Sequence, residues 1–187
     1  MTLRIIKKLD MKGRWLDLAA GDGRYVKELL GKVDSLIVSD VDKIALKTLK
    51  NSIRNSMKNK VQSKTFDVRK KFTFPDNAFD GVFCTGSLHL FSEKQIMKIF
   101  AEIDRILKPK GSIIFDFATD ITRKKKGVNV REKHAYSVAE AEKILKSLMS
   151  NYEVKVYKSS FKDDMSQSKY GWIVTGNFVL AVGRKLN

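Results

Sequence analysis

Residues 15–25, which read WLDLAAGDGRY, constrain the fold more than any other part of the chain. The apolar run at its start predicts a buried strand, and the small residues at 19–23 predict a tight turn. After the turn, apolar residues recur at helical spacing, at Val26, Leu29 and Leu30. A strand, a small-residue turn and a helix form the first part of a nucleotide-binding βαβ unit. Small residues let the backbone approach a ligand closely, and the first N–H groups of the helix can hold an anion.

The spacing of the glycines indicates which kind of nucleotide fits. A dinucleotide-binding G-x-G-x-x-G motif would need a third glycine where the chain has Val26. Instead, Asp17 stands near the end of the strand and is followed by Ala19, Gly21 and Gly23 at alternating positions. A carboxylate at this point faces a cationic group better than a pyrophosphate. The pattern therefore favours a ligand that carries an ammonium and a sulfonium.

A second strand, expected at 35–39, ends on Asp40, at about the distance where an acid takes a ribose hydroxyl pair. With these acids and glycines in place, the chain resembles the class I S-adenosylmethionine-dependent methyltransferases. The resemblance implies that Asp17 serves the cofactor's amino group through water or backbone. It also implies that residues 19, 21 and 23 hold the methionyl part and that Asp40, with Val41 beside it, holds the ribose. Ala19 departs from the family's usual glycine, and we interpret it as a mild replacement.

The resemblance implies an α/β fold over a single domain at 1–187: a Rossmann-like, seven-stranded mixed sheet with helices on both faces and a C-terminal antiparallel hairpin. The resemblance also covers the residues expected at the adenine. A third strand is expected at 61–66, and in the family the next acid accepts the adenine amino group while the following N–H meets a ring nitrogen. These roles fall on Asp67 and on the main chain of Val68. An acid at a strand end is also a common turn residue, which is the alternative.

Residues 74–80 predict a turn and 81–84 a fourth strand, and together they resemble the family's PF-x-x-x-x-FD-x-V segment. Cys84, Thr85 and Gly86 would then line the floor under the methyl group. His89 has a pKa suited to a general base, and it is the weak catalytic candidate; the alternative is that it caps or packs. A lone cysteine on a buried strand usually packs, and we favour this over a nucleophilic role for Cys84.

The second half of the chain predicts regular elements that flank one irregular segment. Residues 92–107 predict a helix with a capping box. The segment at 102–111, which includes the end of this helix, resembles the family's E-I-x-R-x-L-K-P-x-G and leads into a strand at 112–117. We expect 118–134 to be an irregular basic loop that helps to close the substrate pocket. A helix should follow from Ser137 through Met149, and strands at 152–161 and 172–182 should flank a polar loop at 162–171.

The chain carries 37 Lys and Arg against 21 Asp and Glu, a formal net charge of +16. This balance fits a polyanionic partner such as RNA, or lysine used as surface filler. The basic residues cluster at 43–71, where we favour a solvated face over a phosphate-binding surface. The single cysteine excludes an internal disulfide and a CxxC metal site, and we expect no metal. The chain shows neither a membrane span nor a signal peptide, so we expect it in the cytoplasm.

The expected function is methyl transfer from S-adenosylmethionine to an acceptor, with a small molecule first and RNA second. Residues 84–87 lack the proline motif of enzymes that methylate exocyclic amines of bases, which argues against that chemistry. A nicotinamide oxidoreductase is disfavoured by Val26. A non-catalytic member that binds cofactor or a partner protein stays open, as does the oligomeric state.

Overall fold

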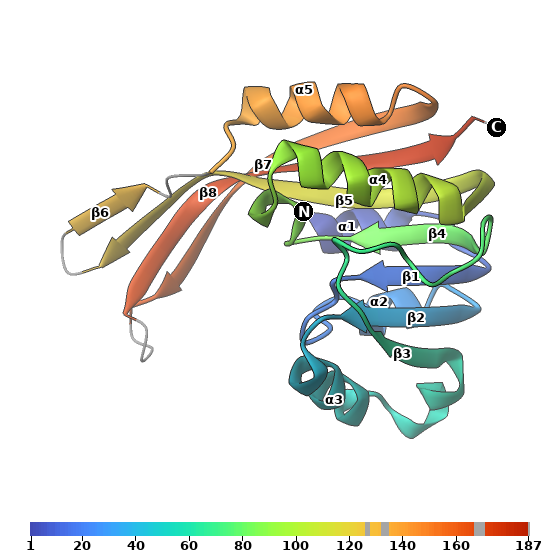
Figure 1. Ribbon diagram of the computed structural model, residues 1–187. Coiled ribbons are helices and arrows are strands. Elements are labelled where there is room, and N and C mark those ends of the chain that lie inside the picture. The colour runs from blue at the N-terminus through green and yellow to red at the C-terminus, as the bar shows by residue number, and fades with distance from the viewer. Residues whose placement is uncertain (126–127, 132–134, 167–170, 187) are drawn as a thin grey trace.

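A computed structural model describes residues 1–125, 128–131, 135–166 and 171–186, without the side chains of 128–131 and 165. Its strands form one sheet in the order β3-β2-β1-β4-β5-β8-β7, and β6 pairs with β5 (Figure 1). The strands are β1 (Arg14–Leu18), β2 (Ser35–Asp40), β3 (Val61–Thr65), β4 (Phe79–Cys84), β5 (Leu107–Lys125), β6 (Val128–Arg131), β7 (Tyr152–Met165) and β8 (Trp172–Lys185). The first five are parallel, whereas β8 runs antiparallel to β5 and to β7. The predicted mixed sheet with a C-terminal antiparallel hairpin is confirmed.

Helices cover both faces of this sheet, as expected (Figure 1). The helices are α1 (Thr2–Lys8), α2 (Val26–Leu30), α3 (Lys43–Ser52), α4 (Glu93–Ile106) and α5 (Val138–Leu148). Alternate residues of β1 point to the two faces: Leu16 packs in the core beneath α4 and α5, and Trp15 packs in the core beneath α1, α2 and α3. The strand order reverses between β1 and β4, and in sheets of this kind ligands bind at the carboxyl ends of the strands at such a switch point.

Local sequence signals explain where the helices begin. Asp42 caps α3, because its Oδ1 accepts hydrogen bonds from the N–H groups of Ile44 and Ala45 at 2.7 and 3.1 Å. At the start of α5, Glu140 accepts from the Ser137 N–H at 2.8 Å while its own N–H donates to Ser137 Oγ at 3.2 Å. A capping box also opens α4. The capping box predicted for the helix at 92–107 is therefore confirmed.

The expectation of an irregular loop at 118–134 is wrong for the residues that the structure describes. β5 continues from the body of the sheet to Lys125, and β6 pairs back on it. β7 and β8 are also longer than predicted and pair from Tyr152↔Lys185 to Met165↔Trp172, so residues 162–165 of the expected loop belong to β7. The rest of that loop lies partly outside the described residues. The ends of β5, β6, β7 and β8 form an extension that projects beyond the other strands (Figure 1).

A small apolar core explains why this polar segment forms strands. Ala118, Ile121 and Val174 are buried in it, and Phe161 and Phe178 pack against them. The basic residues lie around this core: Lys124 is exposed, Arg123 is exposed on the side that lines the cavity, and Lys125 lies over the Trp172 ring. None of the described helices is long and apolar enough to cross a membrane.

Candidate active site

A cavity of about 460 Å³ lies at the carboxyl ends of the central strands, within the range of roughly 300–1,000 Å³ of small-molecule sites. One wall of the cavity is the turn after β1, and the other is the extension, through β5, β7 and β8. The lining residues from the turn and from the loop after β4 are Asp17, Ala19, Ala20, Gly21, Asp22, Arg24, Tyr25, Phe83, Thr85, Gly86 and His89. Those from β5, β7 and β8 are Asp116, Ala118, Ile121, Arg123, Phe161, Asp163, Val174 and Phe178.

The turn after β1 has a backbone that favours glycine at three positions. Ala19, Gly21 and Gly23 have φ of 57°, 55° and 82°. A Cβ added at Gly21 would meet nothing within 4 Å, whereas one at Gly23 would come within 2.6 Å of the Leu49 side chain. Gly21 thus leaves space beside the cavity, and Gly23 allows α3 to pack against the turn. Ala19 therefore adopts a conformation that costs an alanine about 1–2 kcal/mol.

Asp17 is buried at the end of β1 and lines the cavity. Within the described part of the chain its carboxyl group receives no hydrogen bond. Burial, together with the charge of Asp40, raises its pKa to about 8. A buried acid without a partner favours the approach of a cation, which would stabilise its charged form. The site therefore fits the positively charged methionyl part of S-adenosylmethionine.

Asp40 and Val41 lie beside this cavity and not in its lining. Asp40 Oδ2 accepts a hydrogen bond from Gly21 N–H at 2.8 Å, and its Oδ1 accepts from Asp42 N–H at 2.9 Å. Val41 is 66% exposed although it is apolar. The acid that ends β2 is thus tied to the turn after β1, with an uncovered apolar side chain next to it.

Asp67 and Val68 follow β3 and are also outside the lining of the cavity. The end of β3 is joined to the end of β2, because Phe66 N–H donates to the Asp40 carbonyl at 3.2 Å. Asp67 pairs with Arg69 at 2.7 Å, and hydrogen bonds from Arg69 lower the pKa of Asp67 to about 2. The residues expected at the ribose and the adenine thus lie on neighbouring strand ends, next to the turn.

The two remaining candidates, Cys84 at the end of β4 and His89 in the loop after it, have different surroundings. Cys84 is buried, its Sγ lies 3.3 Å from Ser87 Oγ, and burial raises its pKa to about 12. It stays a thiol at neutral pH and packs, and unlike Thr85 and Gly86 it is not among the residues that line the cavity, where it was expected under the methyl group. His89 lies in a short 3-10 helix, Leu88–Leu90, and lines the cavity with Thr85 and Gly86.

Asp116 is the cavity residue that the sequence analysis missed most clearly. It is 3% exposed on β5, and its Oδ1 accepts a hydrogen bond from Gly86 N–H at 2.7 Å. Burial raises its pKa to about 6, against the opposing effects of that hydrogen bond and of Arg24. The signal was available, since Asp116 is a lone acid within the apolar run IIFDF at 113–117.

The wall made by the extension was also missed, because its orientation depends on a bulge in β5. The pairing of β5 with β8 shifts between Thr119 and Thr122, and Asp120 in this bulge has φ of 51°. Gly176 allows Phe161 to lie close to β8, since a Cβ there would come within 2.9 Å of the ring. No group of acidic, histidine or cysteine side chains that could hold a metal occurs in the described residues.

Comparison with known proteins agrees with this geometry. The methyltransferase domain family matches residues 16–111, just over half of the chain. Among solved structures, the YcgJ protein of Bacillus subtilis is 17% identical with a TM-score of 0.73, and the match covers 98% of this chain and 97% of that one. An S-adenosylmethionine-dependent methyltransferase of Methanosarcina mazei is 18% identical with a TM-score of 0.69, and the match covers 98% of both chains. DhpI in complex with SAH is 20% identical with a TM-score of 0.64, over 97% of this chain and 80% of that one.

The fold and the family match agree with a class I methyltransferase, as the resemblance predicted. The chain belongs to the methyltransferase domain family, and S-adenosylmethionine is the cofactor that this membership implies. No curated protein matches the sequence.

Proposed function

We propose that the protein transfers a methyl group from S-adenosylmethionine to a small-molecule acceptor. The observation that carries this proposal is the single continuous cavity, which joins the turn after β1 to a second wall made by β5, β7 and β8. A cofactor at the turn and an acceptor at the extension would meet beside the loop after β4. A direct displacement at the sulfonium methyl needs chiefly this alignment from the protein.

The residues present fit the cofactor in an order along the strand ends. Asp17 would face the cationic methionyl part, and the open space at Gly21 would let that part approach the backbone. Asp40 would take the ribose hydroxyls, with Val41 against the nucleoside. Asp67 and the main chain of Val68 would take the adenine, as the resemblance implies. Arg69 donates four hydrogen bonds to the two carboxyl oxygens of Asp67, which fill the roughly four acceptor sites of a carboxylate, so Asp67 would accept from the adenine amino group only once Arg69 moves aside.

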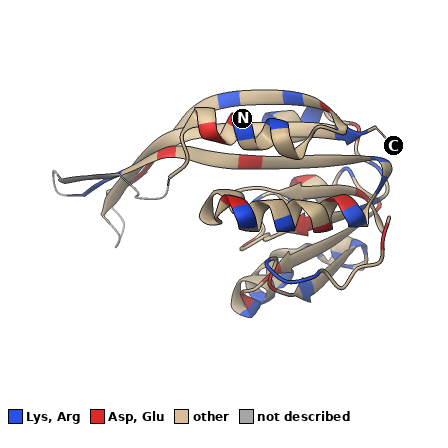
Figure 2. Ribbon diagram, turned by 45° about the horizontal axis from the view of Figure 1, so that its top comes forward, with Lys and Arg blue, Asp and Glu red and all other residues tan. Residues whose placement is uncertain are grey.

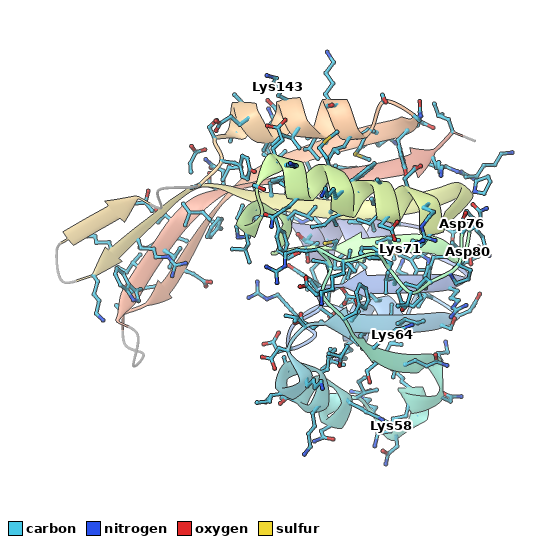
Figure 3. All side chains as sticks on the ribbon, viewed as in Figure 1. Lys58, Lys64, Lys71, Asp76, Asp80 and Lys143 are labelled. Carbon is cyan, nitrogen blue, oxygen red and sulfur yellow. The ribbon has the colours of Figure 1, made fainter. Side chains whose placement is uncertain are left out.

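The charge of the cavity supports a small acceptor over RNA. The whole chain has 37 basic and 21 acidic residues, but the cavity is lined by four aspartates and two arginines. Lys and Arg are spread over the ribbon and interspersed with Asp and Glu (Figure 2). Lys58 and Lys64, in the basic part of the sequence, lie on the side of the molecule that carries α3 and β3 (Figure 3). A polyanion would therefore meet repulsion where the chemistry is proposed.

The test supplies methyl-labelled S-adenosylmethionine to the protein with the low-molecular-mass fraction and, separately, the total RNA of a cell extract. We expect label in a small product, and a large loss of that label with Asp17→Asn. The matched control is Asp10→Asn, an exposed acid whose ion pair is with Lys12. Label in RNA would favour the alternative acceptor. Binding of cofactor without label in either fraction would favour a non-catalytic member.

A further inference from the structure

We propose that the acceptor is a small amine with an apolar body, and that Asp116 accepts the proton that the amine nitrogen loses before methylation. This inference rests on the proposed methyl transfer and names the acceptor for the same cavity. Nothing in the family match specifies an acceptor, so the inference depends on the chemistry of the cavity walls.

Asp116 is held in place by a hydrogen bond to one carboxyl oxygen, and its other oxygen can accept a hydrogen bond from a ligand. Its Oδ1 is held by Gly86 N–H at 2.7 Å, and its Oδ2 receives no hydrogen bond from the described residues. A buried polar group normally has its partners satisfied, so the second oxygen of a carboxyl that is 3% exposed points to a ligand. The space beside Gly86 is open, because a Cβ added there would meet nothing within 4 Å. An acceptor nitrogen can therefore lie between the loop after β4 and Asp116.

The far wall supplies a surface for an apolar body. Phe161 and Phe178 stack with ring centroids 4.4 Å apart and an interplanar angle of 28°. Val174, buried on β8, lies directly between Arg123 of β5 and Asp163 of β7 in the sheet register. Because Phe161 and Asp163 are two residues apart on one strand, they share the face that lines the cavity. This wall is apolar, with Asp163 and Arg123 at its rim, which suits a molecule that is apolar along its length.

The aspartates that line the cavity indicate which nucleophilic group the acceptor carries. A carboxylate or phosphate acceptor would be repelled by the aspartates of the lining. A neutral hydroxyl gains no charge attraction from these acids, whereas an ammonium does. An amine enters as an ammonium attracted by Asp116, and the same burial that raises the pKa of the carboxyl lowers that of the ammonium. The two pKa values therefore approach each other, and a neutral nitrogen becomes accessible.

The transfer then balances in one proton transfer and one displacement. The ammonium first gives a proton to Asp116 Oδ2, which leaves a neutral nitrogen with a lone pair. This lone pair forms a bond to the methyl carbon, and the carbon–sulfur bond breaks with its electron pair left on sulfur. The methylated nitrogen leaves as a cation, and Asp116 then loses its proton to solvent, which restores the carboxylate.

Several charged or titratable groups line the same cavity or lie beside it, and they bear on the pH dependence. These groups are Arg24, Asp17 and Asp22 in and after β1, Cys84 at the end of β4, His89 in the loop after it, Asp163 on β7 and, farther along β5 itself, Arg123. Arg24 opposes protonation of Asp116, whereas Cys84 stays neutral in the range of the experiment. Replacing Asp116 itself isolates its contribution from these groups.

The test measures binding without turnover, by calorimetry on protein saturated with S-adenosylhomocysteine. The probes are phenethylamine, its carboxylate analogue phenylpropanoate, and ethylamine, which has the amine without the apolar body. We expect phenethylamine to bind at least about tenfold more tightly than either of the others. We expect its affinity to fall as the pH drops below about 6, where Asp116 takes up a proton.

Asp116→Asn assigns the effect to this residue and also reports on folding through the cofactor site. It should bring phenethylamine to within about twofold of phenylpropanoate, remove the loss of affinity below about pH 6, and leave the affinity for S-adenosylhomocysteine within about twofold. Asp10→Asn should change none of these values. The proposal is overturned if phenethylamine binds no better than phenylpropanoate, or if neither binds. It is also overturned if Asp116→Asn weakens S-adenosylhomocysteine as much as phenethylamine, which would make Asp116 part of the cofactor site. Failure of wild-type protein to bind S-adenosylhomocysteine would instead overturn the proposed function itself.

Discussion

The backbone N–H of Gly21 donates a 2.8 Å hydrogen bond to Oδ2 of Asp40, so the acid that ends β2 holds the turn that follows β1. The other carboxyl oxygen accepts from Asp42 N–H at 2.9 Å. Asp40 thus has a structural task besides the ribose contact proposed for it. It keeps the turn in a conformation that leaves space beside Gly21.

Replacing Asp40 by alanine should affect both stability and binding. We expect the binding free energy for S-adenosylmethionine to weaken by roughly 1–3 kcal/mol and the free energy of unfolding to fall by about as much, because hydrogen bonds to a charged group are lost. Calorimetry and urea unfolding measure the two. Asp42→Ala is the matched control, since losing the cap of α3 costs about 1 kcal/mol of stability but leaves the Gly21 contact in place. Unchanged affinity in folded Asp40→Ala would contradict the ribose placement.

Two glycines of one turn should respond differently to alanine. Gly23→Ala places a Cβ within 2.6 Å of Leu49 at positive φ, so it should lower the free energy of unfolding by about 2–4 kcal/mol. Gly21→Ala carries only the conformational cost of about 1–2 kcal/mol, but it fills the space where the cofactor is proposed. Its affinity for S-adenosylhomocysteine should fall at least tenfold. Equal affinities for Gly21→Ala and wild type, measured by calorimetry, would place the cofactor elsewhere.

Asp17 should make the stability of the ligand-free protein depend on pH. Its folded-state pKa of about 8 lies above the ordinary 3.8, so the folded protein holds this proton more tightly than the unfolded chain. That contribution to stability is complete at low pH and is lost as the pH rises from about 4 to about 8. Asp17→Asn removes the penalty, and its gain in Tm over wild type should be larger at pH 8 than near pH 5.

The same variant should bind S-adenosylmethionine more weakly, because it lacks the charge that a cationic ligand would stabilise. Thermal unfolding gives the first result and calorimetry the second. A Tm difference independent of pH would show that Asp17 is ionised throughout the range. Asp34→Asn is a suitable comparison, since Asp34 is an acid that accepts a hydrogen bond from Gly13 N–H in an exposed setting.

Gly176→Ala should disturb the wall made by the extension. A Cβ there would lie 2.8 Å from the Thr119 carbonyl and 2.9 Å from the Phe161 ring, so the ring must move at a cost of about 1–3 kcal/mol. Phenethylamine affinity should fall while that for S-adenosylhomocysteine is kept. Gly31→Ala, where φ is −73° and the nearest atom is 3.4 Å away, should preserve both. Loss of S-adenosylhomocysteine binding in Gly176→Ala would contradict the division of the cavity into two walls.

The parts of the site that lie within one local motif could be predicted from the sequence. Asp17, Gly21 and Gly23 belong to a single strand and turn, and capping residues such as Ser137 act on the next turn of their own helix. Their roles depend on neighbours a few residues away in the chain, so the sequence pattern is enough to predict them. Which strand residues face the core also depends on near neighbours, because successive side chains of a strand point to opposite faces. Outside the core, Asp76 and Asp80 come from the turn predicted at 74–80, and they lie at the end of the sheet away from the extension (Figure 3).

The other wall depends on pairing between distant segments. Asp116 gains its partner from Gly86, thirty residues away, and Phe161 reaches the cavity only because β7 pairs with β8 beyond the body of the sheet. The basic residues of 118–134 concealed the strands, since exposed charge does not exclude pairing around a buried core. The positive φ of Ala19 was also hidden, because it is a property of the assembled turn.

The most direct test of the proposed cofactor site is a calorimetric titration of the wild-type protein with S-adenosylhomocysteine, beside NADH. We predict a dissociation constant of about a micromolar for S-adenosylhomocysteine, no measurable heat with NADH, and at least tenfold weaker binding in Gly21→Ala. Absence of binding by S-adenosylhomocysteine, or NADH binding of comparable affinity, would contradict the assignment of this cavity to a methyltransferase.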